Sequence, residues 1–87
     1  MIPARFVVES VFDLPGRSGI LAAGKLEQGV VKGGMTLADS ETRKVVRVLA
    51  IEFATPATER EGRITLVVDR SDAQAVKAGA VLEEGAA

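Results

Sequence analysis

Hydrophobic and polar residues alternate with period two along several short stretches of the chain. The first stretch runs from Arg5 to Leu14 and predicts a strand that is buried on one side only. Glu9 and Asp13 fall on the polar side of this alternation. The other side is apolar and is predicted to face the core, through Phe6, Val8, Phe12 and Leu14. Pro15 and Gly16 then supply the residues of a turn.

The second stretch, 19–28, places Lys25 and Glu27 on one side and an apolar set on the other: Ile20, Ala22, Gly24 and Leu26. A glycine in mid-strand indicates a bulge or a close backbone approach. The octapeptide GILAAGKL in this stretch also comes close to a phosphate-binding loop, but Leu26 stands where that motif needs a hydroxyl for Mg²⁺. The stretch therefore predicts a strand and no nucleotide binding.

Further short strands are predicted over 35–38, 63–69 and 80–82. The segment 43–53 is rich in β-branched residues and apolar on both parities, which indicates a strand that is bulged or buried on both faces. Ser71 and Gln74 form a capping box that opens a short helix ending before Gly79. This pattern predicts an all-β domain, and closure into a barrel removes sheet edges that would aggregate.

Composition excludes several functional classes. Eighty-seven residues suffice for one domain, 1–87, and the chain has neither cysteine nor histidine. Disulfides, thiolate metal sites and the usual general base are thus excluded, and no nucleophile is paired with a base. We therefore predict a protein that is not an enzyme and uses no metal or cofactor. Formal net charge is −1, and no apolar run could cross a membrane, so a cytoplasmic domain without a membrane partner is expected.

The order of certain motifs is similar to that in a known family. The chain carries Glu9-Ser10-Val11-Phe12, a Pro15-Gly16-Arg17 turn, the run Gly24 to Gly34 (GKLEQGVVKGG), and Val81-Leu82 after Gly79. Together these resemble the second domain of elongation factor Tu and related translational GTPases. The resemblance spans Arg5 to Leu82 and implies a closed six-stranded Greek-key barrel, with a short helical turn added by the capping box. Met1 lies so close to the first strand that we expect no GTPase domain before it.

The resemblance also implies candidate contact residues. In elongation factor Tu this barrel holds the 3′ end of aminoacyl-tRNA, and in related factors it touches ribosomal RNA. Glu9 and Phe12 match family positions near the aminoacyl group, and Glu52 matches one near the terminal adenosine. Arg63 stands where the factor has an asparagine, and Ser10 stands where the family has an aspartate.

Basic residues supply further candidates. Arg17 lies at a predicted turn tip, and Arg43, Lys44 and Arg47 lie within five residues of one another, with Arg43 and Arg47 on one face of the predicted strand. Such a cluster could contact RNA phosphates, with a salt dependence of slope about −2 to −3. The leading hypothesis is a free-standing module that binds RNA or a ribosome-associated protein. The alternatives are a protein–protein adaptor, a small structural homo-oligomer, or a fragment of a larger factor.

Overall fold

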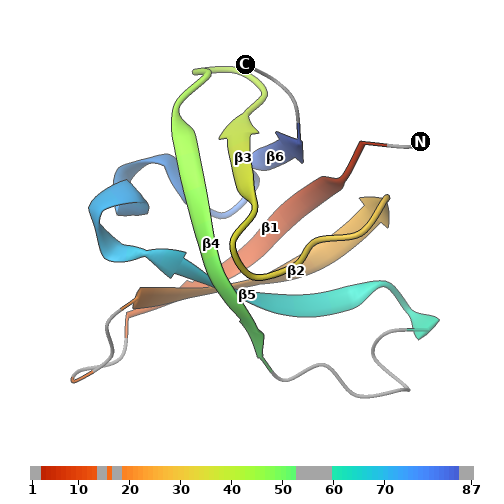
Figure 1. Ribbon diagram of the computed structural model, residues 1–87, viewed down its shortest axis with the longest axis horizontal. Coiled ribbons are helices and arrows are strands. Elements are labelled where there is room, and N and C mark those ends of the chain that lie inside the picture. The colour runs from red at the N-terminus through yellow and green to blue at the C-terminus, as the bar shows by residue number, and fades with distance from the viewer. Residues whose placement is uncertain (1–2, 14–15, 17–18, 53–59, 85–87) are drawn as a thin grey trace.

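The computed structural model describes residues 3–13, 16, 19–52 and 60–84. It is a closed, antiparallel barrel in which the strands follow the order β1-β2-β5-β4-β3-β6 and β6 closes the ring onto β1. The strands are β1 (Arg5–Phe12), β2 (Gly19–Gln28), β3 (Thr36–Asp39), β4 (Val45–Glu52), β5 (Arg63–Asp69) and β6 (Val81–Glu84). A single 3₁₀ helix, η1 (Arg70–Ala75), follows β5 within the described residues. The predicted all-β, closed six-stranded barrel is confirmed (Figure 1).

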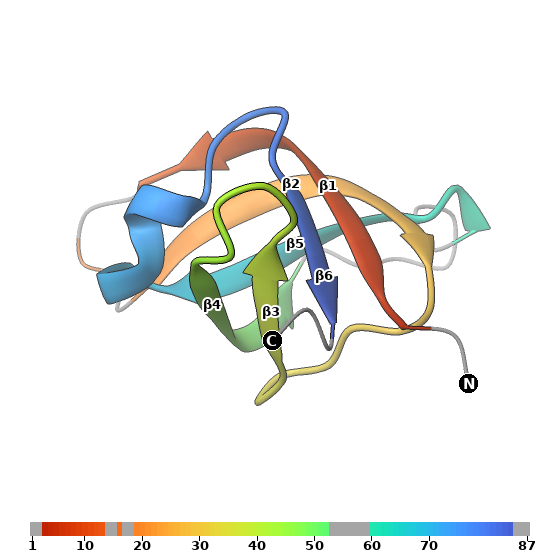
Figure 2. The ribbon, with the colours of Figure 1, turned by 90° about the horizontal axis from the view of Figure 1, so that it is seen from above.

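Aliphatic side chains fill the barrel. Among the described residues, Phe6 is the aromatic side chain of the core cluster, and it has no exposed surface. Figure 2 shows β6 between β3 and β1, where Leu82 joins the two sides of the core. The other fully buried large residues are Leu37, Leu66, Val8, Val46, Val48 and Val68. Because the chain lacks disulfides, this packing carries most of its stability.

Gly24 marks the closest approach between two strands. It pairs with Val8, and a methyl group placed on it would lie 2.0 Å from the carbonyl oxygen of Val7 and 3.0 Å from Cζ of Phe6. Only glycine leaves room for β1 to press against β2 at this point. The prediction of a close backbone approach at Gly24 is therefore confirmed.

The prediction that Phe12 belongs to the core is wrong. Its side chain is 48% exposed. The pairing of β1 with β2 shifts between Val8 and Ser10, so Glu9 is an additional residue of a β-bulge. An inserted residue reverses the alternation of all residues that follow it.

The reversal is visible in the partners of β1. Before the bulge, Val8 faces the interior opposite Gly24. After it, Val11 faces Ala22 of the core, and Phe12 faces Leu21 on the outer surface of the barrel. Leu14, the last residue of the predicted apolar set, lies outside the described residues.

Two further predictions need correction. Arg43 does not share a strand face with Arg47, because β4 begins only at Val45 and Arg43 has a backbone φ of 65° in the preceding turn. The helix is a 3₁₀ helix capped by Asp69, whose carboxylate accepts hydrogen bonds from the backbone N–H and hydroxyl of Ser71. Ser71 thus donates to the cap and is not the cap itself. The predicted bulge in 43–53 is confirmed, between Val48 and Ala50.

Candidate binding surface

The outer face of β1, β2, β5 and β4 carries a row of apolar residues. Strand register places Phe12 beside Leu21, Leu21 beside Val67, and Val67 beside Ala50. Residues opposite each other in antiparallel strands point to the same side of the sheet. We call these four residues, together with Leu49, the outer stripe.

The outer stripe is partly open to solvent. Leu49 sits at the bulge of β4 and is 44% exposed, similar to Phe12. A methyl group added to Gly19 would lie 2.9 Å from the side chain of Val67 and 3.4 Å from that of Leu49. These two side chains therefore converge over the start of β2. Leu21 and Val67, in the middle, are nearly fully buried although they lie outside the core. Phe12 and Leu49 are therefore the members of the outer stripe that offer apolar surface to a partner.

Ion pairs flank the outer stripe along the strand direction. Glu9 and Arg63 form a salt bridge that passes over β2 on one side of it. On the other side, Arg70 donates to the carboxylate of Asp13 at 2.5 Å. All four side chains are well exposed, so each pair contributes only a few tenths to about 1 kcal/mol to folding. Their arrangement matters more for recognition than for stability.

The residues assigned through the resemblance gather on this same face. Glu9 and Arg63 are in contact, and Glu52 ends β4 opposite Thr65, two residues along β5 from Arg63. Phe12 lies further along β1 and is exposed, as a contact residue must be. The structure therefore brings together Glu9, Phe12, Glu52 and Arg63. Leu21, Leu49 and Val67 were missed, because their outward direction depends on register that alternation alone does not reveal.

The basic cluster is less available than its sequence indicates. Arg47 donates from Nε to Asp72 at 3.2 Å and from Nη2 to Ser71 at 3.2 Å, while its backbone N–H reaches the same carboxylate at 2.9 Å. The hydrogen bond to Asp72, reinforced by the charges of Asp72 and Asp69, raises the pKa of Arg47 above its ordinary value. Arg47 thus fastens β4 to η1. Arg17, the remaining basic candidate, lies outside the described residues.

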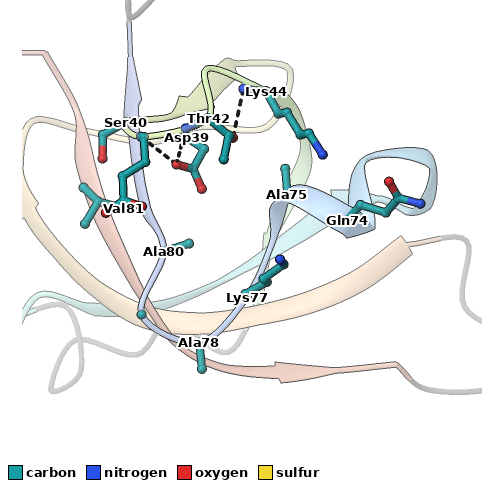
Figure 3. Close-up of a pocket in the computed structure, with 12 residues that line it drawn as sticks. Asp39, Ser40, Thr42, Lys44, Gln74, Ala75, Lys77, Ala78, Ala80 and Val81 are labelled. Carbon is teal, nitrogen blue, oxygen red and sulfur yellow. Dashed lines mark hydrogen bonds between the residues drawn. The ribbon is translucent and has the colours of Figure 1, made fainter.

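A pocket of about 310 Å³ lies between the β3–β4 turn and the segment joining η1 to β6 (Figure 3). Figure 3 shows Asp39 and Lys44 on one wall and Gln74 and Lys77 on the other. Asp39 is almost fully buried, and one of its oxygens accepts hydrogen bonds from the N–H groups of Glu41 and Thr42. Its carboxylate therefore shapes the turn. With Glu41 also lining the pocket, two acids balance two lysines.

Two other kinds of functional feature were sought among the residues that the structure describes, a membrane-spanning helix and a metal site. Among them, no helix is long and apolar enough to span a bilayer, and no three potential metal ligands converge. Comparison with known proteins gives no further assignment, since no family model, curated protein or solved structure matches the chain.

Proposed function

We propose that this barrel is a non-enzymatic binding module whose partner is a protein, contacted through the outer stripe. The observation that supports this most directly is the exposure of Phe12 and Leu49. Both lie on the same outer face as Leu21 and Val67, which are buried. Aromatic and aliphatic side chains that are exposed in the free protein and lose their water on binding are typical anchors of protein interfaces.

Charge favours a protein over RNA. Most arginines of the described residues have a carboxylate partner: Arg5 with Glu27 and Glu83, Arg47 with Asp72, Arg63 with Glu9, and Arg70 with Asp13. A guanidinium held by a carboxylate must give up that partner before it can bind a phosphate. With a net charge of −1, the chain also lacks a long-range attraction for nucleic acid. The resemblance to translation factors supports a contact role for this face, and the partner on a ribosome would then be a protein.

The test compares matched surface variants. Immobilised wild-type protein, Phe12→Ser and Val30→Ser are exposed to lysate of the producing cells, with and without nuclease. Val30 is the control, because it is 61% exposed and follows Gln28, which pairs with Arg5 at the far end of β1 from Phe12. A captured protein is then identified, purified and titrated against all three variants by calorimetry.

The expected result is a nuclease-resistant partner whose affinity falls at least tenfold, about 1.4 kcal/mol, in Phe12→Ser and stays unchanged in Val30→Ser. Capture that disappears with nuclease would instead support the RNA hypothesis. Equal affinity of Phe12→Ser and wild type would remove the outer stripe from consideration.

A further inference from the structure

The half of β1 that carries Phe12 is held by a neighbouring strand on one side only. Strand β6 pairs with residues 5–7 of β1, and backbone hydrogen bonds with Gly79 and Ala80 extend this contact to Val8. Beyond Val8, β2 is the one described strand that pairs with β1, and the last pair joins Phe12 to Leu21. A strand end with a single neighbour opens more readily than a segment with two.

Arg70 connects this end of β1 to the rest of the barrel. It directly follows β5 and begins η1. Its Nη1 donates to Oδ1 of Asp13, the residue after Phe12, at 2.5 Å, and its Nη2 donates to the carbonyl oxygen of Gly19 at 3.4 Å. Gly19 is the first residue of β2, so one guanidinium holds both strands of the β1–β2 pair at the same end. The planar fork of arginine makes two such bonds at once.

We propose that Arg70 is a positioning residue for the partner contact: it holds the end of β1 so that Phe12 is already in place when a partner arrives. This proposal rests on the proposed function. An anchor that is ordered beforehand loses less conformational freedom on binding, and the difference adds to affinity. Both side chains of the Asp13–Arg70 pair are well exposed, so the pair contributes little to the stability of the whole domain. Its effect is therefore expected to be local.

The second ion pair beside the outer stripe does not have this role. Glu9, the partner of Arg63, is the bulge residue directly after Val8, where the contact with the segment before β6 still holds β1. Asp13 instead lies beyond the last paired residue of β1. Loss of the Arg70 pair therefore frees the end that carries Phe12, whereas loss of the Arg63 pair leaves that end attached.

Amide hydrogen exchange on the free protein tests the holding role without any partner. Exchange is followed by NMR at residues 10–12 in wild type, Arg70→Gln, Asp13→Asn, the double variant and Arg5→Gln. Arg5 is the matched control, because it also forms exposed ion pairs but lies at the opposite end of β1, which pairs with both β2 and β6. Urea denaturation of each variant measures the stability of the whole domain.

Arg70→Gln and Asp13→Asn should each speed exchange at residues 10–12 by about two- to fivefold, the range that an exposed ion pair supplies. The double variant should exchange no faster than Arg70→Gln, because both changes remove the same bond. Arg5→Gln should leave exchange at these residues as in wild type. Unchanged exchange in Arg70→Gln would overturn the proposal, and so would exchange that speeds equally throughout the barrel, since that result reports a loss of global stability.

Affinity for the partner that wild type captures completes the test. Arg70→Gln and Asp13→Asn should both bind about two- to fivefold more weakly, and Arg5→Gln should bind like wild type. Asp13→Asn keeps the guanidinium, so a loss confined to Arg70→Gln would mean that Arg70 contacts the partner directly and would overturn the positioning role. Faster exchange with unchanged affinity would also overturn it, while Phe12-dependent binding would leave the proposed function standing. Absence of any Phe12-dependent partner would end the proposed function and the positioning role with it.

Discussion

Phe6 and Phe12 provide a matched pair of truncations on one strand. Both are phenylalanines of β1, separated by the bulge at Glu9. Simple alternation assigns both to the core, whereas the structure buries Phe6 completely and leaves 48% of Phe12 exposed. Replacing each with alanine therefore tests the bulge itself.

The two variants should differ severalfold in the free energy of unfolding that they lose. Phe6→Ala removes a fully buried ring and leaves a cavity beside Gly24, at a cost of about 3–5 kcal/mol. Phe12→Ala loses only about half of the ~2 kcal/mol gained by burying such a side chain, or about 1 kcal/mol, and leaves no enclosed cavity. Since a small domain has a total stability of about 5 kcal/mol, Phe6→Ala should keep only about 0–2 kcal/mol and unfold at very low urea, whereas Phe12→Ala should keep about 4 kcal/mol.

Urea denaturation followed by far-ultraviolet circular dichroism is the suitable assay, because the chain has no tryptophan or tyrosine. Equal m-values would show that the midpoints report free energies of unfolding. A Phe12→Ala cost of about 3 kcal/mol or more would mean that Phe12 is a core residue and that β1 has no bulge.

Three further predictions concern backbone space, pH and salt. Gly24→Ala should destabilise the protein by more than about 2 kcal/mol, because the added methyl group meets a backbone oxygen. Gly34 has open space around it and a φ of 93°, so Gly34→Ala should cost only about 1–2 kcal/mol. Similar urea midpoints for the two variants would refute the close contact at Gly24. Hydrogen bonds from Ser71 lower the pKa of Asp69, so the resulting stability is present above the unfolded-state pKa and is lost as pH falls through the folded-state pKa. Ser71→Ala removes the hydroxyl donor and should therefore raise the pKa of Asp69 in a carboxyl NMR titration, and an unchanged titration would show that the hydroxyl bond is absent. RNA binding measured by fluorescence anisotropy should have a salt slope shallower than about −2, little changed by Arg47→Ala; a slope of −2 to −3 that both Arg43→Ala and Arg47→Ala flatten by about 1 would revive the RNA hypothesis.

The architecture follows from features that act locally. Alternation identifies β2 and β5 because both have a clean apolar parity, and Gly24 signals the close contact of β1 with β2. The need to cover sheet edges then favours closure of the barrel. The β4 strand gives a mixed pattern in the sequence because its bulge exchanges the inner and outer sets halfway along.

The binding surface could be predicted only in part. Glu9, Glu52 and Arg63 were assigned to a contact surface by resemblance, and the structure places them on one outer face. The outer stripe could not be found this way, because its members come from four strands and align only in the folded register. Likewise, the ion pair between Arg47 and Asp72 forms only because η1 packs against β4. Its two residues are 25 positions apart in the sequence.

The bulge at Glu9 connects the fold to the proposed interface. An uninterrupted β1 would place Phe12 in the interior and would leave Leu21 and Val67 without an aromatic neighbour outside. The inserted residue turns Phe12 outward and, at the same position, provides the carboxylate that meets Arg63. One additional residue thus supplies both the anchor of the outer stripe and half of the charge pattern beside it. Bulges that redirect side chains at binding sites are known features of β-sheets.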